Sequence, residues 1–97
     1  MTARLQVDPE LIGPKKAREM LKNLMPDYRP ANMRDVHDFA KAMKRGQWEL
    51  IEPLMYDTRH GLVGGRRRLL AVIEADVEIE FLVMRGEFDF LKEAAHR

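Results

Sequence analysis

The sequence predicts an α+β domain in which about four helices pack against a small mixed sheet. Segments that alternate between apolar and polar residues, as strands do, are interleaved with segments whose apolar residues recur every three or four positions, as in helices. The chain of 97 residues has the length of one domain, and its 45% hydrophobic and 34% charged residues are typical of a globular protein. We therefore expect a single domain over residues 1–97.

The first predicted elements are a strand followed by a helix. Leu5-Gln6-Val7 alternates as a short strand, which Asp8-Pro9 is expected to end. Pro14 suits the first position of a helix because its missing N–H costs nothing there. Apolar residues then recur at helical spacing, which predicts a helix over residues 14–24.

A second helix is predicted over residues 33–45. Asn32 can cap its N-terminus, and Gly46 is a natural stop. Its apolar residues form one stripe, made of Val36, Phe39, Ala40 and Met43. We expect this stripe, and Trp48 shortly after it, to pack against the core.

The second half of the chain is predicted to contain a hairpin, two helices and a strand. Pro53 begins a strand that ends at Asp57, and a proline at this place suggests an edge strand. A tight turn then leads into Leu62-Val63, which completes the hairpin. The remaining predicted elements are a helix over 66–75, an alternating strand from residue 77 that Gly86 ends, and a short final helix over 87–95.

The most informative local feature is the glycine pair Gly64-Gly65, followed by Arg66, Arg67 and Arg68. A helix N-terminus has unpaired N–H groups and a partial positive charge, and glycine lets a ligand approach the backbone closely. Arginine adds donors that match phosphate oxygens, although cations in a first helical turn oppose the helix dipole. The pattern favours an anion site. The alternative, a tight turn beside a solvated arginine surface, stays open.

Several classes of site are excluded or disfavoured by the residues that the chain lacks. The absence of cysteine excludes disulfides, thiolate metal sites and a cysteine nucleophile, and it is compatible with a reducing compartment. The chain opens without an apolar signal region and holds no apolar run of about 18 residues. We expect a cytoplasmic protein with no membrane contact. The three histidines lack any metal-ligand spacing, so no metal site is predicted.

Two residues of the hairpin turn are candidates for a role near the arginines. His60 is expected to lie close enough to contact an anion, although a solvated turn histidine is the simpler alternative. Asp57 is expected to make a turn hydrogen bond. It is also the one acid close to the arginine run in sequence, and therefore the local candidate for a base or metal ligand.

The stretch from Asp57 to Val72 resembles the core motif of ParB/sulfiredoxin-like proteins, most closely the small ParB-like proteins of phages and actinobacteria. Their motif contains a glycine and an arginine followed by Leu-x-Ala, which Gly65, Arg68, Leu69 and Ala71 match. Shorter similarities upstream extend the resemblance over roughly residues 5–85. The motif is degenerate, because Gly64 and Arg66 stand where family members carry polar or acidic residues.

The resemblance implies that the turn binds a nucleotide or nucleic-acid phosphate, with CTP or ATP and an accompanying Mg²⁺ as the possible ligands. It also implies that Arg29 approaches the same pocket. The implied acid that assists chemistry is missing, and so is the catalytic cysteine of the sulfiredoxins. We therefore expect phosphate binding without strong catalysis. A nuclease or nucleotide hydrolase is the less favoured alternative, which rests on the resemblance alone.

A protein-interaction module is the second alternative. In this hypothesis a phage-encoded domain has lost its nucleotide site and modulates a host protein. The final helix would be the interaction appendage, because its aromatic and apolar residues exceed what one docking face needs: Phe88, Phe90 and Leu91. These residues would contact a protein partner or a second copy of the chain.

Overall fold

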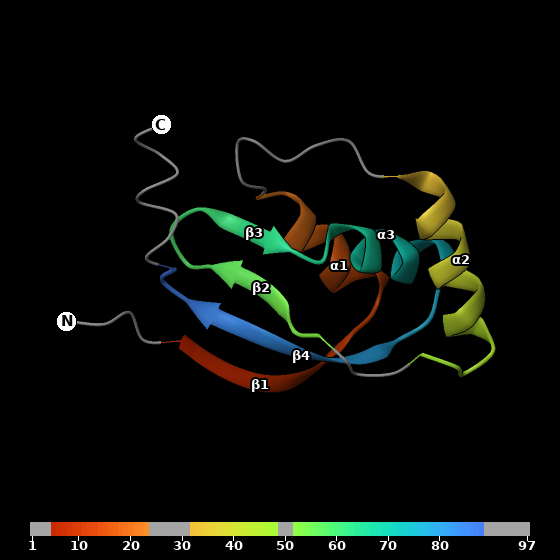
Figure 1. Ribbon diagram of the computed structural model, residues 1–97, viewed down its shortest axis with the longest axis horizontal. Helices are drawn as coiled ribbons and strands as arrows, with labels where there is room; N and C mark the ends of the chain where they lie inside the picture. Colours follow the sequence, from red (N-terminus) through yellow and green to blue (C-terminus); the bar gives the residue numbers. More distant parts are fainter. Residues whose placement is uncertain (1–4, 24–31, 49–51, 89–97) are drawn as a thin grey trace.

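The computed structural model describes residues 5–23, 32–48 and 52–88, which form a sheet with helices packed on it (Figure 1). The α+β class is therefore confirmed. The fourth expected helix, over 87–95, lies almost wholly outside the described residues, and Glu87 and Phe88 themselves are not helical. The described elements are β1 (Leu5–Ile12), α1 (Pro14–Leu21), α2 (Met33–Lys44), β2 (Leu54–Asp57), β3 (Gly61–Gly64), α3 (Arg66–Ala75) and β4 (Ile79–Gly86).

The sheet is mixed and has the strand order β1-β4-β2-β3. β4 runs parallel to β2 and antiparallel to β1, while β2 and β3 form the antiparallel hairpin that the sequence predicts. A parallel pair needs a crossover connection, which β3 and α3 supply between β2 and β4. Figure 1 shows the helices gathered over one face of the sheet.

The core lies between this sheet face and the helices. Leu54, Leu62, Phe81 and Val83 of the sheet are buried against Leu69, Ala71 and Val72 of α3. The predicted stripe of α2 is confirmed, since Val36, Ala40 and Met43 are buried and Phe39 packs at the core margin. Trp48 continues this layer, with its ring 5.2 Å from Phe39 and 6.2 Å from Phe81 in edge-on contacts.

Two strand predictions were wrong. β1 does not end at Asp8-Pro9 but runs on to Ile12, with Pro9 opposite Leu82. β1 forms one edge of the sheet. An edge strand tolerates a proline because the backbone on its outer side makes no hydrogen bonds to another strand. β2, in turn, is an interior strand between β4 and β3, and Pro53 precedes it rather than belonging to it.

A charged cluster fastens β1 to β4 and α1. The guanidinium of Arg85 donates to both carboxylate oxygens of Glu10, at 2.9 and 3.0 Å, and Lys16 Nζ lies 2.7 Å from Oε1. The paired hydrogen bonds from Arg85 are the main cause that lowers the pKa of Glu10 to about 2, against a smaller effect of burial and with help from Lys16. Glu10 therefore stays ionised far into acid.

The stabilisation that Glu10 provides is expected to depend on pH. Its folded pKa of about 2 lies below the ordinary 4.5, so the contribution is complete above about pH 4.5 and is lost as the pH falls towards 2. Urea unfolding of wild type and Glu10→Gln from neutral pH to pH 2 tests this. The difference in unfolding free energy should shrink across that window, whereas a difference that does not vary with pH contradicts the assignment. Glu80→Gln, an exposed position on β4, is the matched control.

Candidate functional site at the start of helix α3

The glycine pair forms the junction between β3 and α3. Gly65 is the N-cap residue of α3 and adopts a left-handed backbone, with φ of +109°. A Cβ atom at this position would lie 2.2 Å from Cδ2 of the buried Leu54, so the leucine side chain would have to move. Gly64 instead closes β3 opposite Met55, where a Cβ atom would meet only ordinary contacts. Of the two glycines, Gly65 is the one that the backbone and the packing both require.

The first turn of α3 carries a concentration of positive charge. It holds Arg66, Arg67 and Arg68 and no acidic residue, and Gly65 provides no side-chain cap. The positive end of the helix dipole adds to these charges. The predicted arrangement of glycine, helix start and arginines is therefore present.

Arg67 turns its guanidinium towards α2. Its Nη1 donates to Oδ2 of Asp35 at 2.5 Å, and the guanidinium carbon lies 5.9 Å from the centre of the Phe39 ring. Both partners of the ion pair are substantially exposed, at 52% for the Arg67 side chain and 36% for Asp35. The first turn of α3 is thereby linked to the first turn of α2, in which Asp35 lies.

Arg68 has a different role, because it binds the backbone that precedes β2. Its Nη1 donates to the carbonyl of Glu52 at 2.5 Å, and its Nη2 lies 3.4 Å from the carbonyl of Pro53. The guanidinium thus holds the start of β2 against the turn. Arg66 is half-buried at the first helical position.

The hairpin turn holds a separate polar cluster around Asp57, which is fully buried. Its Oδ1 accepts the backbone N–H groups of Arg59 and His60 at 2.7 and 2.9 Å and lies 3.0 Å from His60 Nδ1. Its Oδ2 accepts the N–H of Phe88 at 2.9 Å. The expected turn hydrogen bond of Asp57 is confirmed, and the same carboxylate also fixes the chain beyond β4.

The pKa of Asp57 reflects these bonds. Burial alone would raise the pKa of this carboxyl, but the backbone N–H of Phe88 and the other donors outweigh it, so its pKa lies below the ordinary value. A carboxylate that accepts three backbone N–H groups and contacts the His60 ring is engaged in structure. It is poorly placed to take up a proton or to bind a metal at the arginines.

The structure brings together only part of the predicted site. Gly64, Gly65 and the three arginines form one turn, whereas His60 lies at the other end of β3 and is bound to Asp57. β3 spans four residues, so about 10 Å of strand separates the two ends. Arg29 lies outside the described residues. The roles of Arg29 and His60 at a phosphate stay predictions.

Some partners of the site were not apparent from the sequence. Asp35 lies in the first turn of α2, and its spacing there gives no sign that it is the ion-pair partner of Arg67. Phe88 was expected on an interaction surface, yet the residue is only 3% exposed and its N–H is bound to Asp57. Phe90 and Leu91 lie outside the described residues. Contacts of this kind depend on how distant segments meet, and no local pattern marks them.

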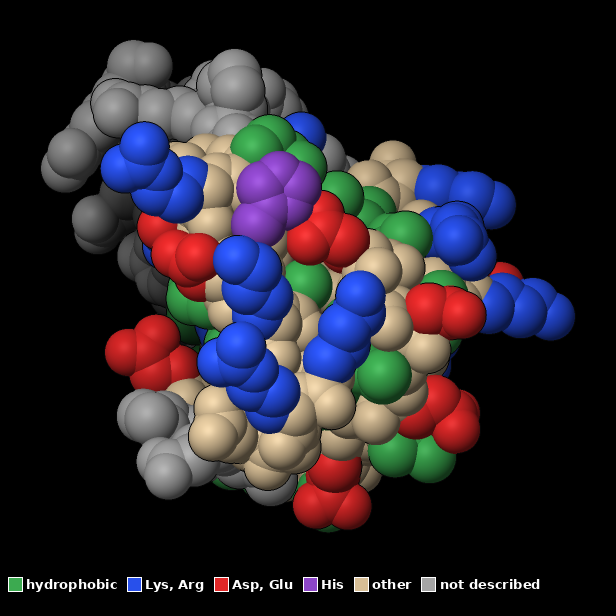
Figure 2. Space-filling model, turned by 90° about the vertical axis from the view of Figure 1, so that its right-hand side faces the viewer, with side chains coloured by type: hydrophobic (Ala, Val, Ile, Leu, Met, Phe, Trp, Pro, Cys, Tyr) green, Lys and Arg blue, Asp and Glu red, His purple; other side chains and the backbone are tan. Residues whose placement is uncertain are grey.

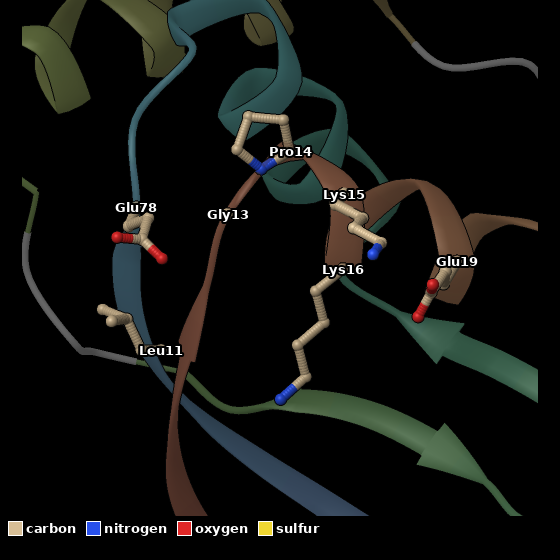
Figure 3. A pocket seen from close by; sticks show the side chains of 7 residues that line it. All are labelled: Leu11, Gly13, Pro14, Lys15, Lys16, Glu19 and Glu78. Atoms are coloured by element: carbon tan, nitrogen blue, oxygen red, sulfur yellow. The ribbon is translucent and has the colours of Figure 1, made fainter.

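A hollow of about 550 Å³ lies at the junction of β1 and α1 (Figure 3), and none of the arginines of the α3 turn lines it. Lys15 and Lys16 line one side, while Leu11 and Glu78 line the other. Glu78 packs closely over Gly13, where a Cβ atom would lie 3.1 Å from its Cγ. Because the lining mixes both signs of charge, it shows no preference for an anion.

Residues 5–23, 32–48 and 52–88 hold neither a cluster of metal ligands nor a helix that could span a membrane. In that part of the chain no cluster of three or more His, Asp or Glu side chains could hold a metal ion. The helices found there are too short or too polar to cross a membrane.

The comparisons with known proteins identify the fold. No family model matches the chain, and no curated protein matches it. Among solved structures it is similar to a Pnob8-like ParB-N domain, with a TM-score of 0.52 and 22% sequence identity. The fold is ParB-like. The match covers 97% of this chain but 35% of the other, so the protein spans about a third of that structure.

Replacement of Asp57 by asparagine is expected to destabilise this ParB-like domain. The amide nitrogen cannot accept the N–H of Phe88, which leaves a buried donor unpaired at a cost of about 1–3 kcal/mol. Urea unfolding at neutral pH measures the loss, with the exposed Asp38→Asn as control. An unfolding midpoint equal to that of wild type would contradict the role assigned to this carboxylate.

Proposed function

We propose that this ParB-like domain binds a phosphate group of a nucleotide or nucleic acid at the start of α3, without strong catalysis. The observation that carries the proposal is the first turn of α3, where three arginines stand at a glycine N-cap with no acid in the same turn. Such a turn combines the helix dipole with donors suited to phosphate oxygens. The similarity to a ParB-N domain supports it only at the level of the fold.

The contacts of Arg67 and Arg68 suggest that the two arginines have different roles at the site. Arg68 positions the turn, because its guanidinium is committed to the backbone before β2. Arg67 is the better candidate for a direct phosphate ligand. Its exposed pair with Asp35 is of a kind worth about 0–1 kcal/mol, so a phosphate can displace the carboxylate at little cost.

The same geometry argues for binding rather than hydrolysis. Phosphoryl transfer needs a group that holds a metal or orients the attacking nucleophile. Asp57 is engaged at the far end of β3, and Asp35 already pairs with an arginine. CTP or ATP, with a Mg²⁺ carried by the nucleotide, remains the favoured ligand class, because the motif of the family that the chain resembles binds nucleotide phosphates.

Nucleotide affinity is expected to respond in opposite directions to two substitutions. Arg67→Gln removes a ligand and should weaken binding of CTP, ATP or inorganic phosphate. Asp35→Asn frees Arg67 from its carboxylate and should strengthen binding roughly two- to fivefold, the range of an exposed ion pair. Isothermal titration of each variant at low and moderate salt measures both effects.

Asp38→Asn and Arg18→Gln are the matched controls, since each makes the same charge change at an exposed position outside the turn. Both should leave the affinity within about twofold of wild type, a difference of less than 0.5 kcal/mol. Equal binding by wild type and Arg67→Gln, or no binding by either, would refute the proposal.

A protein-interaction role is the second candidate, and one observation favours it. Leu5, Val7 and Leu11 alternate along β1 and are 46%, 46% and 57% exposed. In the register with β4, Val7 lies opposite Met84, on the sheet face away from Phe81 and Val83, which the helices cover. An exposed apolar row of this kind is typical of a contact surface.

If that face joins two copies of the chain, sedimentation should show self-association that grows with protein concentration. Leu11→Asp should weaken it by placing a charge in the contact. Met33→Asp, at a comparably exposed residue on α2, should not. A chain that stays monomeric at every concentration would count against self-association.

A further inference from the structure

The side-chain pattern of β1 is reversed with respect to the core. Its register with β4 places Asp8 opposite Val83, and Glu10 lies opposite Phe81 in the same way. The polar residues of β1 therefore lie on the sheet face that the helices cover, and its apolar residues lie on the other face. An edge strand that served only the core would show the opposite pattern, since its apolar side chains would face the helices.

The apolar surface continues from β1 onto its neighbours. Met84 lies opposite Val7, and Met55 of β2 pairs with Met84 in turn. In Figure 1 the helices lie on the other side of the sheet, and none of the described helices covers this side. We call this surface the outer face, and its members are Leu5, Val7, Leu11, Met55, Leu82 and Met84.

Exposed apolar side chains are concentrated on the outer face. Three of the four large hydrophobic residues that are exposed in the described part of the chain belong to β1, and the fourth is Met33 of α2. Figure 2 faces the end of the molecule that carries α2, where Lys and Arg side chains in blue lie among Asp and Glu side chains in red. A continuous apolar surface, in contrast to scattered residues, is typical of a contact site.

The charges beside the outer face are acidic. Glu80 lies opposite Leu11, Glu78 immediately precedes β4, and both are exposed. Arg85 is the one basic residue within β1 and β4, and it lies on the helix side, bound to Glu10. A second copy would therefore bring the same acids and no cation from these strands. Acidic neighbours also disfavour anionic ligands, so a partner with cations is the complementary one.

The dimensions of the outer face match a single helix. β1 and β4 have eight residues each, so the face is about 26 Å long, and three strands make it about 10–15 Å wide. This footprint lies well below the roughly 800 Å² per partner that stable complexes between domains bury. An α-helix is about 10–12 Å across and needs about 17 residues to extend over 26 Å. Strand addition at the edge is less suitable, because Pro9 lacks an N–H in the middle of β1.

The hollow between β1 and α1 lies where the outer face ends at Leu11 (Figure 3). Leu11 and Glu78 line one side of it, while Lys15 and Lys16 line the other. Lys16 is already bound to Glu10. A lysine or arginine of a partner can lay its apolar stem on Leu11 and bring its charge to Glu78.

We propose that the outer face binds one amphipathic helix of a partner protein, whose apolar stripe is flanked by lysine or arginine. The inference rests on the second candidate function, a protein-interaction role of this face, and it is independent of the phosphate site on α3. The apolar stripe of the partner covers Val7 and Leu11, and its cations meet Glu78 and Glu80. A single helix on so small a face gives a reversible complex rather than a permanent one.

The test uses two fluorescent helical peptides of about 17 residues with the same leucine stripe, one flanked by lysine and the other by glutamate. Fluorescence anisotropy measures their binding to wild type, Leu11→Asp and Glu80→Lys. Met33→Asp and Asp38→Lys are the matched controls, because they make similar changes at exposed positions of α2. Thermal unfolding checks that each variant keeps its fold.

Wild type should prefer the lysine peptide. Leu11→Asp should weaken that binding roughly tenfold or more, and Glu80→Lys should weaken it about three- to tenfold while it strengthens binding of the glutamate peptide. Both controls should stay within about twofold of wild type. Equal binding of the two peptides, or equal losses in the controls, would overturn the proposal.

Sedimentation separates this failure from failure of the interaction role itself. If wild type self-associates and Leu11→Asp does not, the outer face joins two copies, and the helical partner is wrong although the face is an interface. If wild type stays monomeric and binds neither peptide, both the helical partner and the interaction role of the face are refuted.

Discussion

The turn between β3 and α3 is the constraint on which the described structure depends. Gly65 reverses the chain with a left-handed backbone in direct contact with Leu54, and this places the first turn of α3 against the start of β2. From there α3 runs between α1 and α2, and its Leu69, Ala71 and Val72 fill the core above the sheet. A side chain at position 65 would strain this backbone and force the buried Leu54 side chain to move.

The arginines that follow have different contacts, one within the fold and one at the surface. The guanidinium of Arg68 donates to backbone carbonyls just before the interior strand β2. Its role is therefore to hold the turn in place. Arg67 makes an exposed ion pair that costs little to break. The fold thus fixes the turn through Arg68 and leaves Arg67 in an exposed ion pair, and the proposed phosphate site rests on this difference.

What could be predicted from the sequence depended on how local the signal was. Helix α3 matches its predicted bounds because a glycine and the apolar spacing define it within ten residues. β1 was predicted too short and β2 was placed at an edge, because strand order is set by pairing between distant segments. The glycine–arginine turn was found from its pattern. The partners of Arg67 and Arg68 were not, since they come from α2 and from the segment before β2.

The net charge of +1 conceals a polarised molecule, and the contacts explain how. Among the acids of the described residues, Glu10, Asp35, Asp57 and Glu74 all bind groups within the fold. Glu10, Asp35 and Glu74 pair with basic side chains and Asp57 is buried, while several lysines and arginines of α1 and α2 stay exposed. A nearly neutral chain can therefore have helices whose exposed side is mainly basic, because its lysines and arginines outnumber the acids in the first half of the sequence.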